Sequence, residues 1–293
     1  FHRHRLGKPR YWPELFRFIR DLRRRRFDVA VDLQGLLRTG LFAFLSGARR
    51  RIGFRAAREG AHFFYNERVL LPANLSHAVD KNLFLVQAGL DVPEDACIWE
   101  LAELPVAGQK ADDLLKPLRE EPGTRVVAVA PAARWPSKRW PPDFFAQVID
   151  RAATQHPACA FWLLGTEDEA AVGQQVADAC QVARPQNLMG KADLGTLVEL
   201  LRRTDVLLTN DSGPMHVAAA LRVPTVALFG PTDPDLTGPY GDQNHVFRGA
   251  CDRAPCFERR CPSPSQRCVD SVKADVVADA LVEQLASYTA DIR

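Results

Sequence analysis

A polar turn between two apolar segments has the residue types and the spacing of a phosphate-binding site. It lies within "TNDSGPMHVAAALRVPTVALFGPTDP", residues 209–234. Asp211 or Ser212 can cap the helix that follows, and Gly213 allows a ligand to approach the backbone closely. A helix N-terminus offers N–H groups and a partial positive charge to an anion, and His216 in the first turn can donate to the same anion. An ordinary helix cap with a first-turn histidine is the alternative interpretation of this turn.

Lys138 is a second residue whose type and position suit phosphate chemistry. It lies in "PAARWPSKRWPPDFF", residues 131–145, in the loop that follows the apolar run "RVVAVA". An ammonium group at that place can neutralise the charge that develops on a departing diphosphate. The alternative is a solvated surface lysine, which is the more common fate of a single lysine.

Three consecutive acids open the helix after another apolar run. The stretch "LLGTEDE" places Gly165 at the end of a strand and Glu169 in the turn that follows. An acid at the carboxyl end of a strand can hold ribose hydroxyls in a nucleotide-binding fold. The alternative is that the three acids complement the helix dipole, as acids in a first turn usually do.

The elements that must position these residues alternate between strands and helices. Apolar runs predict strands within 27–35, 49–54, 125–130, 160–165, 205–209 and 224–230. Helical periodicity predicts helices from Pro13 to Leu22 and over 36–47, 77–90 (closed by Gly89), 110–118, 142–155, 167–180, 194–203, 214–221 and 272–288. This alternation is typical of parallel sheets built from βαβ units, in which ligands bind beyond the carboxyl ends of the strands.

Charge and cysteine content narrow the class of protein. The chain has 293 residues, a formal net charge of +2 and no apolar run as long as a membrane-spanning helix. Arginines crowd the first 58 positions, which predicts a basic surface suited to phosphate, anionic lipid or nucleic acid. Cys97, Cys159 and Cys180 lie scattered in apolar context, as expected of buried, reduced thiols in a cytoplasmic protein.

The other four cysteines form a cluster near the carboxyl terminus. Cys251, Cys256, Cys261 and Cys268 are separated by four, four and six residues. Four thiolates can hold a tetrahedral zinc ion, although the usual zinc knuckle places its cysteines two residues apart. Reduced or partly disulfide-linked structural cysteines are the alternative.

Several motifs taken together resemble glycosyltransferase family 9, which contains the lipopolysaccharide heptosyltransferases. They are "KRW", "LLGTEDE", "NDSGPMHVAAALRVPTVALFGPTDP" and "GPYG", together with "FDVAVDLQGLLRTG" and "RRIGF" nearer the start. The resemblance covers nearly the whole chain in order, and its most specific part runs from Asp211 to Pro234. It implies an α/β fold of the GT-B class, with two Rossmann-like lobes whose parallel sheets face a cleft and with an incomplete first lobe.

The resemblance also implies a domain organisation. Residues 1–118 are expected to form a truncated acceptor lobe, and residues 119–270 the donor lobe that binds the ADP-sugar. Residues 271–293 are expected to form a terminal helix that packs back towards the first lobe.

The activity implied by the resemblance is that of an inverting heptosyltransferase. The enzyme would move heptose from ADP-L-glycero-D-manno-heptose to the inner core of lipopolysaccharide, on an acceptor of the Kdo-lipid A type. No metal or other cofactor is expected, because Lys138 and the helix N-terminus take the place of a divalent cation. The family also implies a cytoplasmic monomer without a nucleic-acid partner, in peripheral contact with the inner face of the cytoplasmic membrane.

Individual roles follow from positions in the motifs. Lys138, on the phosphates, and Asp211, near the sugar, are the expected catalytic residues. The implied donor-binding residues are Arg134, Lys138, Glu169, Ser212, Gly213 and His216, and the implied acceptor-binding residues are Gln34, Arg38, Arg58 and His77. Met189, Gly190 and Lys191 lie near the expected adenine pocket.

The chain departs from the family at its start. Family members open with a strand and a Gly-Asp loop whose aspartate is the expected general base, and these 293 residues contain no such opening. Asp28 and Asp32 are poor substitutes, because Asp28 starts a strand and Asp32 lies within it near its end. We therefore expect the base to belong to a missing amino-terminal segment and this chain to bind donor with little activity.

Three other functions remain open from the sequence. The nearest is a related transferase that uses another nucleotide sugar, because the motifs define a diphosphate site better than a base or a sugar. A second is a catalytically dead homologue that binds nucleotide. The third is a zinc-bearing nucleic-acid-binding protein, which would use the cysteine cluster and the basic first residues.

Overall fold

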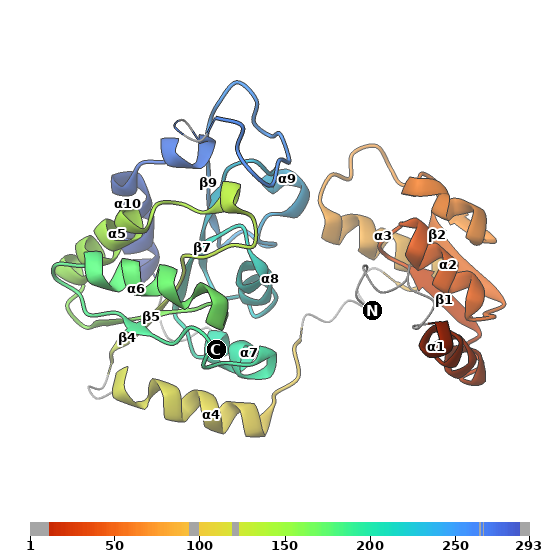
Figure 1. The fold of residues 1–293 in the computed structure, drawn as a ribbon, viewed down its shortest axis with the longest axis horizontal. Coiled ribbons are helices and arrows are strands. Elements are labelled where there is room, and N and C mark those ends of the chain that lie inside the picture. Colours follow the sequence, from red (N-terminus) through yellow and green to blue (C-terminus); the bar gives the residue numbers. More distant parts are fainter. Residues whose placement is uncertain (1–11, 94–99, 119–122, 264, 266, 288–293) are drawn as a thin grey trace. The chain divides into compact units, whose positions relative to one another are not determined.

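The computed structural model describes residues 12–93, 100–118, 123–263, 265 and 267–287. The chain forms two compact units, Phe1–Cys97 and Ile98–Arg293. Each unit has its own parallel sheet, and Figure 1 labels most of their elements. The prediction of an α/β fold with two sheet-containing lobes is therefore confirmed.

The first unit is built on a three-stranded sheet in the order β1-β2-β3, with both pairings parallel. Its elements are α1 (Trp12–Arg24), β1 (Val29–Asp32), α2 (Leu37–Leu45), β2 (Arg50–Phe54), the 3-10 segment η2 (Arg58–Phe64), β3 (Glu67–Val69) and α3 (Ala78–Leu90). Ile52 of β2 and Leu85 of α3 are fully buried. Because the strands are parallel, the loops after β1, β2 and β3 all leave from one edge of this sheet.

Gly89 has a different role from the expected one. It lies inside α3, which ends at Leu90, and the C-cap residue Asp91 adopts the left-handed conformation with φ of 53°. A Cβ atom at position 89 would lie 2.6 Å from Cγ2 of Ile52. Glycine is therefore required there for close packing of α3 on β2.

The second unit is built on a six-stranded parallel sheet in the order β6-β5-β4-β7-β8-β9. Its strands are β4 (Arg125–Ala130), β5 (Cys159–Leu163), β6 (Gln186–Asn187), β7 (Val206–Asn210), β8 (Thr225–Phe229) and β9 (His245–Arg248). Its helices are α4 (Pro105–Leu115), α5 (Pro142–Gln155), α6 (Ala170–Ala179), α7 (Leu194–Arg202), α8 (Gly213–Ala220), α9 (Pro234–Thr237) and α10 (Ala274–Ser287). Short 3-10 segments are η4 (Lys116–Leu118), η5 (Pro136–Lys138), η6 (Glu167–Glu169) and η8 (Cys268–Ser271).

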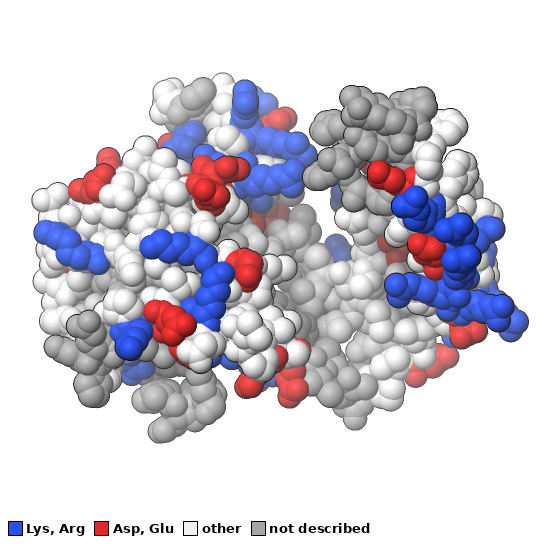
Figure 2. Space-filling model, turned by 60° about the horizontal axis from the view of Figure 1, so that its bottom comes forward, with Lys and Arg blue, Asp and Glu red and all other residues white. Residues whose placement is uncertain are grey.

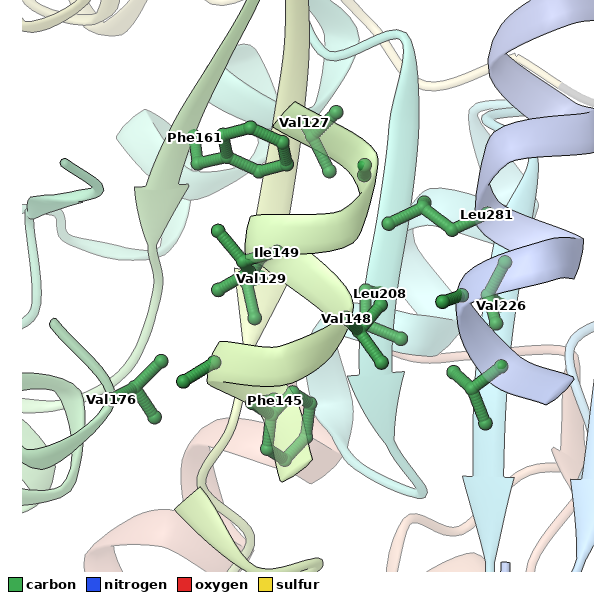
Figure 3. Close-up of a cluster of buried hydrophobic side chains, with 14 of the residues drawn as sticks. Val127, Val129, Phe145, Val148, Ile149, Phe161, Val176, Leu208, Val226 and Leu281 are labelled. Atoms are coloured by element: carbon green, nitrogen blue, oxygen red, sulfur yellow. The ribbon is translucent and has the colours of Figure 1, made fainter. Parts of the chain in front are cut away.

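Helices cover both faces of this sheet, which explains why its central strands are apolar on both sides. Val127 and Val129 of β4 pack with α5, α6 and α10 on one face (Figure 3). Val126 and Ala128 of the same strand pack with α4, α7 and α8 on the other face. Full burial of a valine or leucine side chain contributes about 1.5–3 kcal/mol, so this double-sided core holds the strand ends rigidly.

The boundary between the units lies earlier in the chain than the expected position 118. Helix α4 belongs to the second unit, where Ala111 and Leu115 are buried against α7. The backbone N–H of Leu104 also donates to Glu199 Oε1 of α7 at 3.0 Å. The described residues 100–118 thus belong to the second unit and not to the first.

The terminal helix α10 packs on the sheet of the second unit. Val277 and Leu281 of α10 are buried in the core of the second unit, and Arg151 of α5 forms an ion pair with Asp279 of α10. The described part of segment 271–293 therefore completes the layer over the second sheet. No helix among the described residues is both long and apolar enough to cross a membrane.

Candidate functional site

The centre of the candidate site is an ion pair between Lys138 and Asp211. Lys138 Nζ lies 2.5 Å from Asp211 Oδ2, and the Thr232 hydroxyl donates to the same oxygen at 2.6 Å. The three residues follow β4, β7 and β8, which are neighbours in the sheet. The sheet order therefore brings together, at the carboxyl ends of the strands, two residues that the sequence predicted and one that it did not.

Burial makes this cluster electrostatically significant. The side chain of Asp211 is 6% exposed and that of Lys138 is 16% exposed. Charges at such a depth interact more strongly than they do in water, and a buried carboxylate without partners would be destabilising. Asp211 therefore holds Lys138 at the carboxyl edge, where its ammonium group is available to an anion.

Asn210 fixes the loop that carries Lys138. Its side-chain amide donates to the carbonyl of Pro131 at 2.7 Å, and its Oδ1 accepts the backbone N–H of Trp140 at 3.1 Å. Both bonds are buried, and they hold the two ends of the loop between β4 and α5. The turn that carries Lys138 is thus hydrogen-bonded to Asn210, at the end of β7, through residues before and after it.

The turn η5 adds a contact to the lysine itself. Lys138 Nζ lies 4.6 Å from the centre of the Trp135 ring, a cation–π distance. Trp140 is 1% exposed, and its indole N–H donates to the carbonyl of Val272. Trp140 therefore serves packing, whereas Trp135 contacts the catalytic candidate Lys138.

The N-terminus of α8 lies next to this cluster, and the side chain of Ser212 does not cap it. Ser212 has an extended backbone conformation, and its hydroxyl lies 3.1 Å from that of Thr209. Asp211 is directed to Lys138 and Thr232. A Cβ atom on Gly213 would meet no atom within 4 Å, so open space adjoins the first turn. Ser212 occupies the N-cap position without a side-chain cap hydrogen bond, so an anion can approach these N–H groups.

The other donor-side candidates lie at the surface of the same unit. Arg134 is exposed in the loop after β4, and His216 is exposed in the first turn of α8. Glu169 follows β5 and accepts hydrogen bonds from the backbone and the hydroxyl of Thr166 at 3.1 and 3.0 Å. Glu169 thus closes a capping box with Thr166 at the start of η6 and remains partly exposed.

The segment expected near an adenine lies beside the end of β5. The backbone N–H of Gly190 donates to the carbonyl of Gly165 at 3.0 Å. Met189 is 6% exposed and belongs to the apolar core, whereas Lys191 is exposed. The loops after β5 and β6 are therefore joined, with Met189 beneath them.

In the first unit, Asp32 organises the loop that carries Gln34. Its Oδ1 accepts the N–H groups of Gln34 and Gly35 at 2.9 and 3.1 Å, and its Oδ2 accepts the hydroxyl of Tyr65 at 2.6 Å. Burial, reinforced by the hydrogen bond to Asp32, raises the pKa of Tyr65 above its ordinary value. Asp32 is thus committed to structure, in agreement with the expectation that it is a poor general base.

The expected acceptor-binding residues share one edge of the first sheet. Gln34 follows β1, Arg58 follows β2 and His77 follows β3. The backbone N–H of Arg58 donates to the carbonyl of Gly35 at 2.9 Å, which brings the first two loops together. His77 caps α3 by accepting the N–H of Val79 at 3.2 Å, and Arg38 is exposed in the first turn of α2.

The cysteine cluster does not form a metal site among the described residues. Cys251, Cys256, Cys261 and Cys268 line a cavity of about 130 Å³. No group of three or more His, Cys, Asp and Glu side chains in the described part of the chain is arranged to hold a metal ion. The six cysteines described have free thiols. The zinc candidate therefore has no preformed ligand geometry.

The fold and the site define a two-unit α/β protein with a buried lysine–aspartate pair, a candidate anion-binding centre, at the carboxyl edge of its second sheet. The family model of glycosyltransferase family 9 (heptosyltransferase) matches residues 15–266. The chain belongs to this glycosyltransferase family, as its motifs indicated.

Curated relatives agree with this assignment. The chain is 27% identical over 237 residues to lipooligosaccharide heptosyltransferase 2 of Haemophilus influenzae, covering 77% of this chain and 66% of that protein. It is 29% identical over 241 residues to lipopolysaccharide heptosyltransferase 2 of Escherichia coli K12, covering 78% of this chain and 67% of that protein. The matched segment thus spans about two thirds of the length of these relatives.

Solved structures show the same fold. A glycosyl transferase family 9 structure from Veillonella parvula has a TM-score of 0.78 at 22% identity, covering 92% of this chain and 77% of that one. Escherichia coli heptosyltransferase WaaC with ADP has a TM-score of 0.71 at 22% identity, covering 96% and 80%. The expected GT-B fold class is confirmed by these similarities.

Proposed function

We propose that this chain is a heptosyltransferase of the lipopolysaccharide core that uses an ADP-activated heptose as donor. The observation that carries the proposal is the Lys138–Asp211–Thr232 cluster beside the first turn of α8. It presents a cation and backbone donors at one point, which is the arrangement that a sugar diphosphate requires. Both curated relatives described above are named heptosyltransferases of lipopolysaccharide or lipooligosaccharide, and one solved relative is named with ADP.

In this proposal the donor diphosphate lies between Lys138 and the N-terminus of α8. Departure of the nucleotide leaves negative charge on the β-phosphate, and fixed positive groups at that point lower the barrier. Lys138 would turn from Asp211 towards the phosphate, with Ser212, Gly213 and His216 on the other side of it. Asp211 remains beside the sugar, and Glu169 and Arg134 lie on the nucleoside side. This charge neutralisation is our reason for proposing metal-independent transfer.

We propose inversion at the anomeric carbon, in which the acceptor hydroxyl attacks on the face opposite the departing nucleotide. Direct displacement needs a base that removes the hydroxyl proton. Asp32 cannot serve while both of its oxygens hold the loop of Gln34 and Tyr65. Gln34, Arg38, Arg58 and His77 would bind the inner-core acceptor, whose carboxylates and phosphates suit basic partners.

The basic surface of the first unit supports the proposal that the protein binds to the membrane that carries the acceptor. Figure 2 shows lysine and arginine side chains gathered over part of this unit. Arg17, Arg20 and Arg24 of α1 are exposed and contribute to this charge. We propose peripheral binding of a monomer to an anionic bilayer on its cytoplasmic face, since clustered arginines are attracted to such a surface.

Calorimetric titration with ADP, UDP and GDP tests the donor site. We expect the chain to prefer ADP, and Lys138→Ala to weaken ADP binding about tenfold, which corresponds to about 1.4 kcal/mol. Lys273→Ala, at an exposed lysine outside the cluster, is the matched control and should leave the affinity unchanged. A folded sample that binds none of the three nucleotides would refute the proposed donor site.

A related nucleotide-sugar transferase is the second candidate, because the cluster recognises a diphosphate and not a particular base. Preference for UDP or GDP in the same titration would favour it. Nucleotide binding without transfer to lipopolysaccharide acceptors would instead identify a nucleotide-binding homologue.

A further inference from the structure

The segment after β9 that ends at the first residue of η8 is closed at its base; it is here called the cysteine loop (residues 250–268, of which 264 and 266 lie outside the described residues). The Ser271 hydroxyl accepts the N–H of Ala250 at 2.9 Å and donates to the carbonyl of Cys268 at 2.8 Å. A Cβ atom on Gly249 would lie 2.1 Å from that same carbonyl oxygen, so only glycine fits. The two ends of the loop therefore lie directly against each other, with Cys251 near one end and Cys268 at the other.

The thiols of these two residues share a small cavity but differ in access. Cys251 is exposed, whereas Cys268 is 5% exposed, and both line the cavity of about 130 Å³ together with Cys256 and Cys261. Burial raises the pKa of the Cys268 thiol to about 11, and the neighbouring thiols of Cys251 and Cys256 contribute to the shift. An oxidant in solution therefore reaches Cys251 first, and Cys268 is placed to react second.

The cysteine loop forms hydrogen bonds with two segments of the candidate donor site, the one that carries Lys138 and the one that carries Thr232. The Ser137 hydroxyl donates to the carbonyl of Glu258 at 2.6 Å, and the N–H of Phe257 donates to the carbonyl of Pro231 at 2.8 Å. Ser137 immediately precedes Lys138, and Pro231 immediately precedes Thr232. The loop thus holds the residues that immediately precede Lys138 and Thr232, and a change in its rigidity can reach the site through these hydrogen bonds.

We propose that Cys251 and Cys268 are a site of reversible disulfide formation that stiffens the cysteine loop and holds Lys138 and Thr232 around Asp211. The oxidant is a small disulfide such as oxidised glutathione. The Cys251 thiolate attacks it and releases one glutathione thiolate, and the Cys268 thiolate then attacks Cys251 Sγ and releases the second. Two protein thiols become one disulfide, while one glutathione disulfide becomes two thiols. The effect on donor binding rests on the proposed function, whereas the thiol chemistry does not.

A bound metal is less compatible with the same residues. No three of the four thiols are arranged for coordination in the described part of the chain. Cys261 Sγ is already directed to the carbonyl of Ser263 at 3.4 Å. A pair of thiols at the closed base of the loop needs no third ligand, so a disulfide fits this geometry better.

The test begins with the reduced chain, whose ADP affinity is measured first by calorimetry. The chain is then incubated with oxidised glutathione, and cross-linked peptides are mapped by mass spectrometry. We expect one Cys251–Cys268 cross-link, a mass lower by about 2 Da and ADP binding at least threefold tighter, because a stiffer loop loses less freedom on binding. Dithiothreitol should reverse all three changes.

Cysteine variants distinguish the contribution of the Cys251–Cys268 pair from that of the other two cysteines in the loop. Cys251→Ser and Cys268→Ala should abolish the cross-link and the gain in affinity, while Cys256→Ser and Cys261→Ser in the same loop should retain both. Thermal unfolding of each reduced variant establishes that it is folded. Cys251→Ser is the decisive variant where Cys268→Ala fails to fold, because Cys251 is exposed.

Three results would overturn the proposal. They are a cross-link confined to other cysteines, a cross-link that leaves ADP affinity unchanged, and zinc or iron retained by the purified chain through these thiols. Failure of the reduced chain to bind any nucleotide would refute the proposed donor site, while the peptide map would still report on the disulfide.

Discussion

Asn210 at the end of β7 accepts the backbone N–H of Trp140, which lies 70 residues earlier in the chain, in a buried hydrogen bond of 3.1 Å. The same side chain donates to the carbonyl of Pro131. One amide therefore holds both ends of the segment that presents Lys138 to Asp211.

Asn210→Ala is expected to destabilise the second unit by about 2–4 kcal/mol. The substitution leaves a buried N–H and a buried carbonyl without partners, and each such group costs about 1–3 kcal/mol. It should also weaken ADP binding, because the lysine loop loses its attachment to β7. Urea denaturation and calorimetry measure the two effects.

Asn66 provides a matched control for that substitution. Its side chain also bonds two backbone groups, the N–H of Arg51 and the carbonyl of Arg49, both at 2.7 Å, but these bonds are exposed. Water can replace exposed partners, so Asn66→Ala should cost less than about 1 kcal/mol. Equal destabilisation by the two variants would contradict the role given to Asn210.

Thr232→Val is expected to weaken ADP binding about fivefold, or about 1 kcal/mol, with little change in the volume of the side chain. Valine cannot donate to Asp211 Oδ2, so the carboxylate would be held by Lys138 alone and would compete with the phosphate for it. Thr232→Ser keeps the hydroxyl and should retain near-normal affinity. The idea fails if the serine and valine variants bind ADP equally.

The stability of the second unit is expected to depend on pH through the carboxyl group of Glu199. Burial opposes ionisation of this carboxyl, but hydrogen bonds from Arg203 and the Leu104 N–H, with the charge of Arg202, outweigh burial and hold its pKa below 4.5. A depressed folded-state pKa gives stability that is present above 4.5 and is lost as the pH falls through the folded value. Wild-type unfolding free energy should therefore fall with acidification below about pH 4.5.

Glu199→Gln removes this dependence and identifies its source. The variant should lose about 2 kcal/mol or more at pH 7, because Arg203 and Arg202 lose a buried partner that is 3% exposed. Its acid limb below pH 4.5 should be flatter than that of the wild type. Asp113→Asn, at an exposed acid of α4, is the control. Parallel acid limbs for wild type and Glu199→Gln would assign the acid sensitivity to another group.

The arginines of α1 are expected to bind anionic membranes. Replacement of Arg17, Arg20 and Arg24 by glutamine should weaken binding to phosphatidylglycerol vesicles about 100-fold, because each arginine near such a surface contributes about 1 kcal/mol. Flotation of the chain with vesicles, repeated at rising salt, measures the effect. Binding should decline with salt as the charges are screened.

Three exposed cations of the second unit give a control with the same change in net charge. They are Arg184, Arg222 and Lys273. Their replacement by glutamine should leave vesicle binding nearly unchanged. A similar loss in both triple variants would show that net charge, and not the surface of α1, controls the interaction.

Local pattern was sufficient to predict most elements of the second unit. The continuous β-branched run of β4 and the helix over Pro142–Gln155 agree with the structure to the residue. Their signals are contained in a few neighbouring residues, namely an apolar run in one case and a proline start with helical periodicity in the other. The strands β3 (Glu67–Val69) and β6 (Gln186–Asn187) were missed, because two or three mostly polar residues carry no periodic signal and are strands only through pairing.

Position in a motif was likewise sufficient to select Lys138 and Asp211, since each follows an apolar run at the carboxyl end of a strand. Only the tertiary structure showed that they contact each other, that Thr232 shares their oxygen and that Asn210 holds the loop. These relationships depend on the strand order β4-β7-β8, which places segments 73 and 21 residues apart side by side.

The boundary of the second unit was decided in the same way. Helix α4 has an apolar face that its sequence reveals, but its partner α7 lies far along the chain and binds it through Glu199 and Leu104, 95 residues apart. The sequence by itself determined the local elements and the chemistry that each loop can offer. Which loops meet, and which core each helix completes, was decided by packing, because burial rewards contacts between residues whose separation in the chain leaves no local trace.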